Sequence, residues 1–268
     1  MTVSLMWRTA VAGSLAALLL LGGCSSTPKN ESPNASAQRL YKEAKDDAES
    51  GSYERAIKSM ERVEGLAAGT VLAQQAQLDV AYYQWRAGER ESALTSLDRF
   101  IKLNPSSAAF DYALYLRGII NFNDSLGFVA NLAGQDLSER DQRASRDSHQ
   151  SFKRLVDLYP GSKYTPDAKL RMDYIVNSLA KYEVNVARYY LRRGAYVAAA
   201  NRAQQMVSEY PQTPATEEAL AIMVESYAKL ELTTLRESAE RVLAKNFPRS
   251  RFIAGNANLG ARPWWRFW

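Results

Sequence analysis

Cys24 is the only cysteine of this chain, and its thiol is a nucleophile. It stands two glycines behind a run of twelve apolar or small uncharged residues, Ala10 to Leu21, which follows Arg8 closely. Twelve helical residues reach roughly 18 Å, well short of the ~30 Å hydrocarbon core of a membrane. Residues 1–23 therefore predict a secretory signal peptide and not a transmembrane helix.

The run Leu21-Gly22-Gly23-Cys24 resembles the lipobox of bacterial lipoproteins. This resemblance implies cleavage after Gly23 and lipidation of the Cys24 sulfur and the new α-amino group. Several acyl chains hold a protein at a membrane where a single chain would be marginal. Ser25 follows the cysteine, and by resemblance to enterobacterial lipoproteins the lack of an aspartate there favours export to the outer membrane. An ordinary signal peptide with a chance cysteine is the alternative.

The composition narrows the choice of partners. The chain carries 34 basic and 29 acidic residues, and losing Arg8 with the signal peptide lowers the net charge from +5 to +4. This charge is small and the chain is expected to be exported, so we do not predict a nucleic-acid partner. Binding to an anionic membrane surface or to an acidic protein partner remains an open alternative. Once Cys24 is lipidated, no cysteine is left for a disulfide, so a hydrophobic core must stabilise about 245 mature residues.

Beyond the cysteine, the sequence offers no recognisable catalytic or metal-binding pattern. The single histidine, His149, has no second histidine or free cysteine with which to bind a metal, and we interpret it as an ordinary surface or core residue. The sequence contains no glycine-rich phosphate loop, no Gly-x-Ser-x-Gly and no His-x-x-x-His motif. We therefore expect a non-enzyme that needs no cofactor and no metal.

The hydrophobic periodicity divides the mature chain into three parts. From residue 37 to about 248, apolar residues recur at three- and four-residue spacing, which indicates helices throughout. Residues 24–36 are polar, include two prolines and predict a lipidated flexible tether. Residues 249–268 form a basic, aromatic tail.

A short pattern recurs within the helical region. Gly-x-Tyr-x-x-Ala begins at Gly51 and again at Gly194, and a related Gly-Glu-Arg-x-x-Ala begins at Gly88. Glycine permits a tight turn, and a small alanine lets the two flanking helices approach closely. Prolines that can stop the second helix close four of the units, at Pro105, Pro160, Pro211 and Pro248.

This pattern resembles the tetratricopeptide repeat, a helix–turn–helix unit of about 34 residues. We therefore predict an all-α fold, a right-handed solenoid of about five tetratricopeptide-like helix hairpins. Terminal repeats of such arrays are commonly atypical, and the first and last units here match least well. The repeats are expected at about 37–70, 74–107, 107–161, 165–213 and 214–248.

Three local features depart from a regular array or mark its boundaries. Residues 125–142 are an insertion into the third repeat, and insertions in helical arrays go to loops, often on a working face. Residues 166–193 lack an internal breaker and predict one helix of 28 residues, roughly 42 Å long, or two helices joined by a kink. The Thr-Pro pairs at 165–166 and 213–214 predict N-caps.

The first helices of the repeats carry the candidate binding residues. By resemblance to the tetratricopeptide fold, these helices line a concave groove. Aromatic anchors beside cations suit an extended peptide with an aromatic residue and a carboxylate; the alternative is that several of the aromatics are core. A second stripe, Ala76, Val80 and Tyr83, suits packing between helices. The groove positions are Tyr41, Lys45, Gln75, Leu78, Tyr82, Trp85, Arg86, Tyr112, Tyr115 and Phe122.

Two further groups are candidates for partner contact. A basic cluster flanks the turn of the fourth repeat, and either meets an acidic partner or forms a solvated face; it consists of Arg188, Arg192, Arg193 and Arg202. The last five residues of the chain include four large aromatic side chains, which favours insertion into a partner, the membrane interface or a groove over exposure to water. Packing back onto the fifth repeat is the alternative. These aromatics are Trp264, Trp265, Phe267 and Trp268.

The lipobox, the tether and the interrupted array together resemble the BamD family, lipoproteins of the outer-membrane β-barrel assembly machine. The segments that carry the likeness are YKEAKDDAESGSYERAI, AQLDVAYYQWRAGERESALTSLDRFIKLNP and SLAKYEVNVARYYLRRGAYVAAANRAQQMVSEYP. The likeness covers essentially the whole mature domain, apart from the aromatic tail, which we cannot match to the family pattern.

The resemblance implies a non-catalytic scaffold, lipid-anchored on the periplasmic face of the outer membrane. The C-terminal repeats, with Arg193 and Arg202, would dock a POTRA domain of the barrel protein BamA. The N-terminal groove would receive unfolded outer-membrane proteins and the small lipoprotein BamC. A repeat lipoprotein that acts as pilotin for a secretin, or as an activator of a peptidoglycan synthase, is the alternative. The aromatic tail could also mimic a substrate and occupy a groove.

Overall fold

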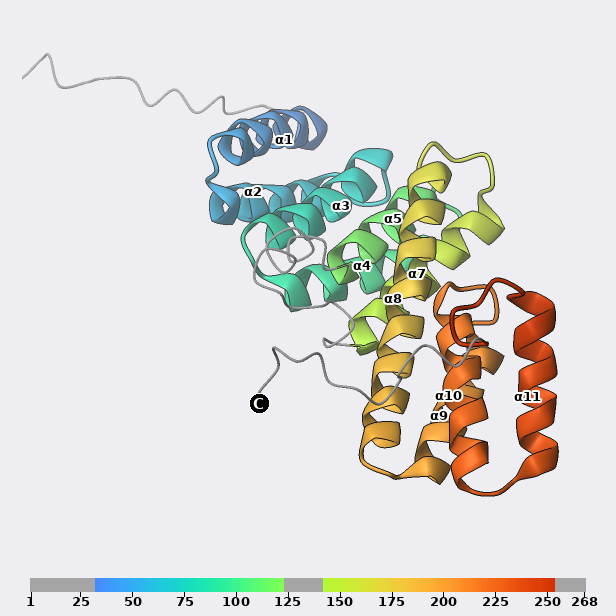
Figure 1. The fold of residues 1–268 in the computed structure, drawn as a ribbon. Coiled ribbons are helices and arrows are strands. Elements are labelled where there is room, and N and C mark those ends of the chain that lie inside the picture. The colour runs from blue at the N-terminus through green and yellow to red at the C-terminus, as the bar shows by residue number, and fades with distance from the viewer. Residues whose placement is uncertain (1–31, 123–141, 254–268) are drawn as a thin grey trace, which may run out of the picture.

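The computed structural model describes residues 32–122 and 142–253, and the regular structure of this part of the chain is α-helical. Ten helices follow one another in five pairs, and each helix packs on the next, from α1 at one end of the stack to α11 at the other (Figure 1). The pairs are α1 (Pro33–Glu49) with α2 (Tyr53–Leu66), α3 (Val71–Arg86) with α4 (Arg90–Leu103), α5 (Phe110–Asn121) with α7 (Gln142–Leu158), α8 (Thr165–Arg192) with α9 (Tyr196–Glu209), and α10 (Ala215–Lys229) with α11 (Thr233–Asn246).

Positive backbone φ angles explain the recurring glycines. Gly51, Gly88 and Gly194 lie between the two helices of their pairs at φ of 78°, 87° and 75°, in the left-handed region where a side chain is disfavoured. In the last pair Glu231 takes this place at φ 59°. The glycine signal is therefore absent from the fifth repeat although its turn has the same backbone conformation.

Helix α8 is one helix of 28 residues, Thr165–Arg192, so the first of the two alternatives for residues 166–193 is correct, with bounds shifted by one residue. Its first half packs in a cluster with α5 and α7, where Ile175 and Leu179 meet Phe152. Its second half packs in another cluster with α9 and α10, through Val184 and Leu191. Figure 1 shows α8 running past both parts of the stack, so this helix joins the N-terminal repeats to the C-terminal ones.

The start of the first repeat corrects the expected tether. Helix α1 begins at Pro33, with Ser32 as N-cap, whose side chain accepts a hydrogen bond from the Ala35 N–H at 3.3 Å. Ala37 is already fully buried. A tether that extends to residue 36 is therefore wrong by about one helical turn, because Ser32-Pro33 combines an N-cap with a first-turn proline.

The two Thr-Pro pairs do not form the predicted side-chain caps. The N-caps of α8 and α10 are Tyr164 and Pro214, without a side-chain hydrogen bond. Thr165 Oγ1 instead donates to the Tyr159 carbonyl at 2.8 Å, and Thr213 Oγ1 donates to the Tyr210 carbonyl at 3.0 Å. These hydroxyls add a hydrogen bond to carbonyls just past the end of the preceding helix, which also accept from the backbone N–H groups of Ser162 and Thr213.

Helices α5 and α7 cross at a glycine. A Cβ on Gly118 would clash with Phe152 Cε1, and the Ser148 hydroxyl donates to the Gly118 carbonyl at 2.8 Å. Only a glycine leaves room for the Phe152 ring at this point. The contact therefore fixes α5, before the insertion, against α7, after it.

Several predicted features lie outside the described residues: the signal peptide, nearly all of the insertion and the last fifteen residues of the tail. Within residues 32–122 and 142–253, the helices are too short or too polar to cross a membrane.

Candidate peptide-binding and docking surfaces

The predicted groove residues of α1 and α3 meet at a buried carboxylate. The Tyr41 hydroxyl donates to Asp79 Oδ2 at 2.8 Å, and Gln75 Nε2 donates to Asp79 Oδ1 at 3.3 Å. Asp79 is only 7% exposed, so these bonds offset the cost of burying its charge. Burial and the bond to Asp79 raise the pKa of Tyr41, which therefore remains a neutral donor.

Lys45 provides a cation beside the same carboxylate. Its Nζ lies 5.7 Å from the centroid of the Tyr83 ring. Burial opposes the charge of Lys45, but nearby Asp79, Tyr83 and Glu49 together outweigh it and raise the pKa of the ammonium. Lys45 thus keeps its charge at neutral pH, and Tyr83 itself is almost fully buried, as the packing stripe predicted.

Further along α3, an arginine lies over two aromatic rings. The Arg86 guanidinium is 5.4 Å from the Tyr53 ring and 5.9 Å from the Tyr82 ring, and its Nη1 donates to the Tyr82 hydroxyl at 3.0 Å. Tyr82 also packs edge-on against Trp85, with centroids 5.9 Å apart. These rings are half-buried and Arg86 is exposed, so cation and apolar surface are presented together.

The tyrosines of α5 continue the aromatic surface toward α8. Tyr112 packs on the same core cluster as Tyr82 and Trp85, and its ring lies 5.6 Å from that of Tyr164. Tyr115 stacks on the other side, 4.7 Å from the Tyr164 ring. Burial raises the pKa of Tyr112, so it too is neutral.

The first turns of α8 supply groups that the sequence did not indicate. The Tyr115 hydroxyl and Arg171 Nε both donate to Asp167 Oδ2, at 2.8 and 2.7 Å. Burial opposes the charge of Asp167, but these two bonds outweigh it and lower the pKa of the carboxyl. The Arg171 guanidinium also lies 4.8 Å from the Phe122 ring, which meets the exposed Tyr174 at 5.8 Å.

We call this set the aromatic row: half-buried or exposed rings with adjoining cations, contributed by α1 to α3, α5 and the first half of α8. The row comprises Tyr41, Lys45, Tyr53, Tyr82, Trp85, Arg86, Tyr112, Tyr115, Phe122, Tyr164, Arg171 and Tyr174. Neutral phenols can donate and accept hydrogen bonds, exposed guanidinium groups can bind a carboxylate, and the ring faces can pack on apolar side chains. The row is suited to binding a peptide.

Leu78 is not part of this surface. Its exposed fraction is 0%, and it packs with Ala81, Leu97 and Phe100 in the core between α3, α4 and α5. The predicted stripe 75, 78, 82 and 85 spans a wide arc of the helix, and Leu78 lies on the side that faces the next pair. Asp79, which the stripe omitted, is the residue that connects α1 to α3.

The structure divides the predicted basic cluster into two kinds of arginine. Arg188 Nε donates to Glu218 Oε1 on α10 at 2.6 Å. Arg202 Nη1 donates to Glu183 Oε2 at 3.0 Å, and the Glu183 side chain is only 4% exposed. Both arginines therefore stabilise the packing of α8 on its neighbours, whereas the other two members of the predicted cluster, Arg192 and Arg193, are exposed.

The exposed part of the cluster lies at the turn between α8 and α9. Arg192 and Arg193 are exposed, and the Arg193 guanidinium lies 5.6 Å from the ring of Tyr189, whose hydroxyl accepts from Arg193 Nε at 3.2 Å. Tyr189 and Val197 are 48% and 58% exposed. This turn combines positive charge with apolar surface, a pattern common at protein interfaces.

The remaining predicted residues add little to these surfaces. Gly23, Cys24 and the four tail aromatics lie outside the described residues. His149 is half-buried on α7, where burial and nearby Lys153 lower the pKa of its imidazole. Among the described residues, no group of histidine and carboxylate side chains is arranged to hold a metal ion.

Comparisons with known proteins agree on one family. The family model YfiO, described as an outer membrane lipoprotein, matches residues 33–243. The outer membrane protein assembly factor BamD of Neisseria meningitidis serogroup B is 45% identical over 233 residues, which cover 87% of each chain. BamD of Xylella fastidiosa is 36% identical over 242 residues, 90% of this chain and 83% of the relative. A solved structure of TPR-like repeats from a putative kinesin light chain of Podospora anserina is similar at 13% identity and a TM-score of 0.36, over 81% of this chain and 98% of that one.

Proposed function

This chain belongs to the BamD (YfiO) family of outer membrane lipoproteins, and from that premise we propose that it is a scaffold with two separate binding surfaces. It is a non-catalytic assembly factor of the outer membrane, as the family resemblance predicted. In the proposal, the aromatic row receives unfolded outer-membrane proteins, and the turn between α8 and α9 docks a POTRA domain of BamA. The same membership argues against the pilotin and synthase-activator alternatives.

The observation that carries the first part is the aromatic row itself. Its rings are neither fully buried, as core residues would be, nor isolated on the surface, and the cations Arg86 and Arg171 lie within 6 Å of their faces. Outer-membrane proteins typically end in an aromatic residue, whose side chain would pack on the rings while its terminal carboxylate meets a guanidinium. BamC would compete for this surface.

The second surface is supported by charge and exposure. Arg193 and Arg192 are exposed next to Tyr189 and Val197, so an acidic, partly apolar patch on a POTRA domain would be complementary to it. Arg202 contributes chiefly by holding Glu183 and thereby fixing α9 on α8. Lipidation of Cys24 would place both surfaces close to the periplasmic face of the outer membrane.

A peptide titration tests the first surface. A fluorescent ten-residue peptide that ends in phenylalanine, with a free carboxylate, is titrated with the mature chain and with Tyr82→Ala and Arg86→Ala. We expect each variant to weaken binding by about tenfold, which corresponds to one lost aromatic or charge-assisted contact of ~1.4 kcal/mol. Tyr189→Ala, an exposed tyrosine of the other surface, is the matched control and should bind as the parent does.

Amidating the peptide's C-terminus sharpens this test. The amidated peptide should bind the parent more weakly than the free acid, and Arg86→Ala should remove that difference. Equal affinity for both peptides, or an unchanged affinity of Tyr82→Ala, would contradict the proposal.

A further inference from the structure

A polar cavity lies between α4, α5 and α7, formed by side chains other than those of the aromatic row and the α8–α9 turn. Its volume is about 160 Å³, and its lining includes Asp98, Leu114, Arg117, Gln150, Ser151 and Arg154. Helices α4 and α7 are the second helices of adjacent pairs, whereas the row is formed mainly by first helices and α8.

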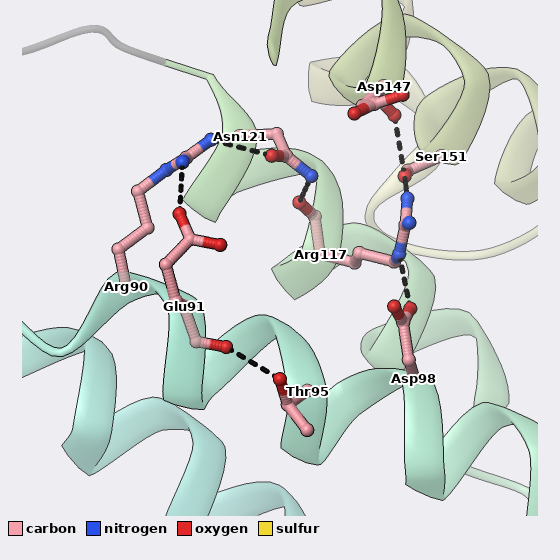
Figure 2. A network of polar contacts seen from close by, with 8 residues as sticks. All are labelled: Arg90, Glu91, Thr95, Asp98, Arg117, Asn121, Asp147 and Ser151. Carbon is pink, nitrogen blue, oxygen red and sulfur yellow. Dashed lines mark hydrogen bonds and ion pairs between the residues drawn. The ribbon is translucent and has the colours of Figure 1, made fainter.

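Arg117 is held rigidly in the wall of this cavity. Its Nε donates to Asp98 Oδ1 on α4 at 2.7 Å, and its Nη1 donates to Ser151 Oγ on α7 at 2.7 Å. The Ser151 hydroxyl in turn donates to the Asp147 carbonyl at 2.8 Å. Figure 2 shows the guanidinium stretched between Asp98 and Ser151, so that it spans the gap between the two helices.

The network extends behind Arg117 to the end of α5. Asn121 Nδ2 donates to the Arg117 carbonyl at 3.2 Å, and Asn121 Oδ1 accepts from Arg90 Nη2 at 2.8 Å (Figure 2). Arg90 Nε also donates to the Ile120 carbonyl at 3.2 Å. Because backbone and side chain are both held, Arg117 loses little further freedom when it binds a ligand, which lowers the entropic cost of binding.

The charges around the cavity leave one cation without a carboxylate. Asp98 neutralises Arg117. Arg154 is exposed, and its guanidinium lies 5.2 Å from the Phe110 ring, with no carboxylate partner among the described residues. The cavity therefore attracts a single negative charge. A planar carboxylate matches a guanidinium well and carries one charge, whereas a doubly charged phosphate exceeds the single positive charge that Asp98 leaves at the cavity.

The size of the cavity decides the kind of ligand. Pockets for small molecules usually measure about 300–1,000 Å³, so 160 Å³ is too small to enclose one but admits a single side chain. We infer that this cavity is an anchor point for a glutamate or aspartate side chain of a protein partner, bound between Arg117 and Arg154. This third contact is separate from the peptide-binding and docking surfaces proposed above, and it does not depend on them.

Photo-crosslinking in outer membranes tests the inference. The full lipidated chain carries p-benzoylphenylalanine in place of Gln150, an exposed residue at the cavity, and the crosslinked partner segment is identified by mass spectrometry. We expect a segment that contains glutamate or aspartate. Arg154→Glu should lower the yield at least tenfold, and exchanging the partner's acidic residue for lysine should restore it.

Two variants keep the result interpretable. Lys102→Glu reverses an exposed charge on α4 away from the cavity lining and should leave the crosslink unchanged. Arg154→Gln removes the charge without reversing it, should unfold at the same temperature as the parent and should lose most of the crosslink. The absence of a crosslink, a segment without an acidic residue, or a yield insensitive to Arg154→Glu would each overturn the inference.

Discussion

Two neighbouring parts of the helical stack, joined by α8, use the same hairpin but pack it differently. Around α5, α7 and the first half of α8, the core contains Phe110 and Phe152, and further aromatic rings pack against it. Around the second half of α8, α9 and α10, five of the nine core residues are alanines: Ala180, Ala187, Ala199, Ala203 and Ala219.

This difference separates the roles of the two regions. Alanines let α8, α9 and α10 approach closely, and the charges there, such as Arg188 and Arg202, pair across the helices. In the third pair and the first half of α8, aromatic side chains fill the core, and further rings pack half-buried against it, next to the Arg171 guanidinium. This contrast agrees with the proposal of a peptide-binding surface on the N-terminal repeats and a separate docking surface at the turn between α8 and α9.

The largest expected effect distinguishes the two cores. Phe152→Ala should lower the free energy of unfolding by about 3–5 kcal/mol, since Phe152 is fully buried and fills the space over Gly118. Hydrogen exchange should show the loss of protection chiefly in α5 and α7. Met206→Ala, the matched variant in the alanine-rich core, should instead affect α9 and α10. Equal loss in both regions for both variants would contradict their separation.

The next effect separates stability from docking. Arg202→Ala should destabilise the chain by about 1–3 kcal/mol in urea unfolding, because it leaves the buried Glu183 carboxylate without its partner. Adding Glu183→Gln should restore most of the stability. If the double variant also regains BamA binding, Arg202 acts only through packing; a persistent loss of binding would assign it a direct contact.

A smaller effect compares two tyrosines. Tyr41→Phe removes the hydroxyl that donates to buried Asp79 and should cost about 1–2 kcal/mol of stability. Tyr189→Phe removes an exposed hydroxyl bonded to Arg193 and should change stability by less than about 0.5 kcal/mol. The change in stability of each variant is measured by thermal unfolding. A cost as small for Tyr41→Phe as for Tyr189→Phe would show that the α1–α3 contact is not held by Asp79.

The smallest effect is a pH dependence from His149. Its pKa is lowered in the folded state, so the unfolded chain binds more protons as the pH falls through the usual histidine range near 6.5. Stability should therefore decrease between pH 7.5 and pH 5, and His149→Gln should flatten that slope. Asp167 does not contribute to this slope. The pKa of its carboxyl is lowered in the folded state, so the stability it contributes is lost only at a more acidic pH. An unchanged slope in His149→Gln would contradict the assignment.

Local patterns in the sequence predicted the helices well. The spacing of Gly51, Gly88 and Gly194 marked three of the turns, and the lack of a breaker indicated the extent of α8 but left a kink within it open. These features depend on neighbours within one or two helical turns. The fifth repeat was harder to recognise because Glu231 adopts the turn conformation that glycine takes elsewhere.

Contacts between distant residues could not be predicted in this way. Leu78 was assigned to the groove because helical spacing gives the face of a residue but not which neighbouring helix covers it. Gly118 has no special sequence context, and its role depends on Phe152, which lies on another helix beyond the insertion. The pairing of Arg202 with Glu183 depends likewise on how α9 packs on α8.

The most direct test of the account is to measure one pair of variants against both partners. Tyr82→Ala and Arg193→Glu are each titrated with the phenylalanine-ending peptide and with the BamA POTRA domain that we propose to dock at the turn between α8 and α9. The account predicts that Tyr82→Ala binds the peptide about tenfold more weakly and the POTRA domain as tightly as the parent does. Arg193→Glu should bind the POTRA domain at least about tenfold more weakly and the peptide unchanged. If either variant lowers the affinity for the peptide and for the POTRA domain equally, the two surfaces are not separate and the account is wrong.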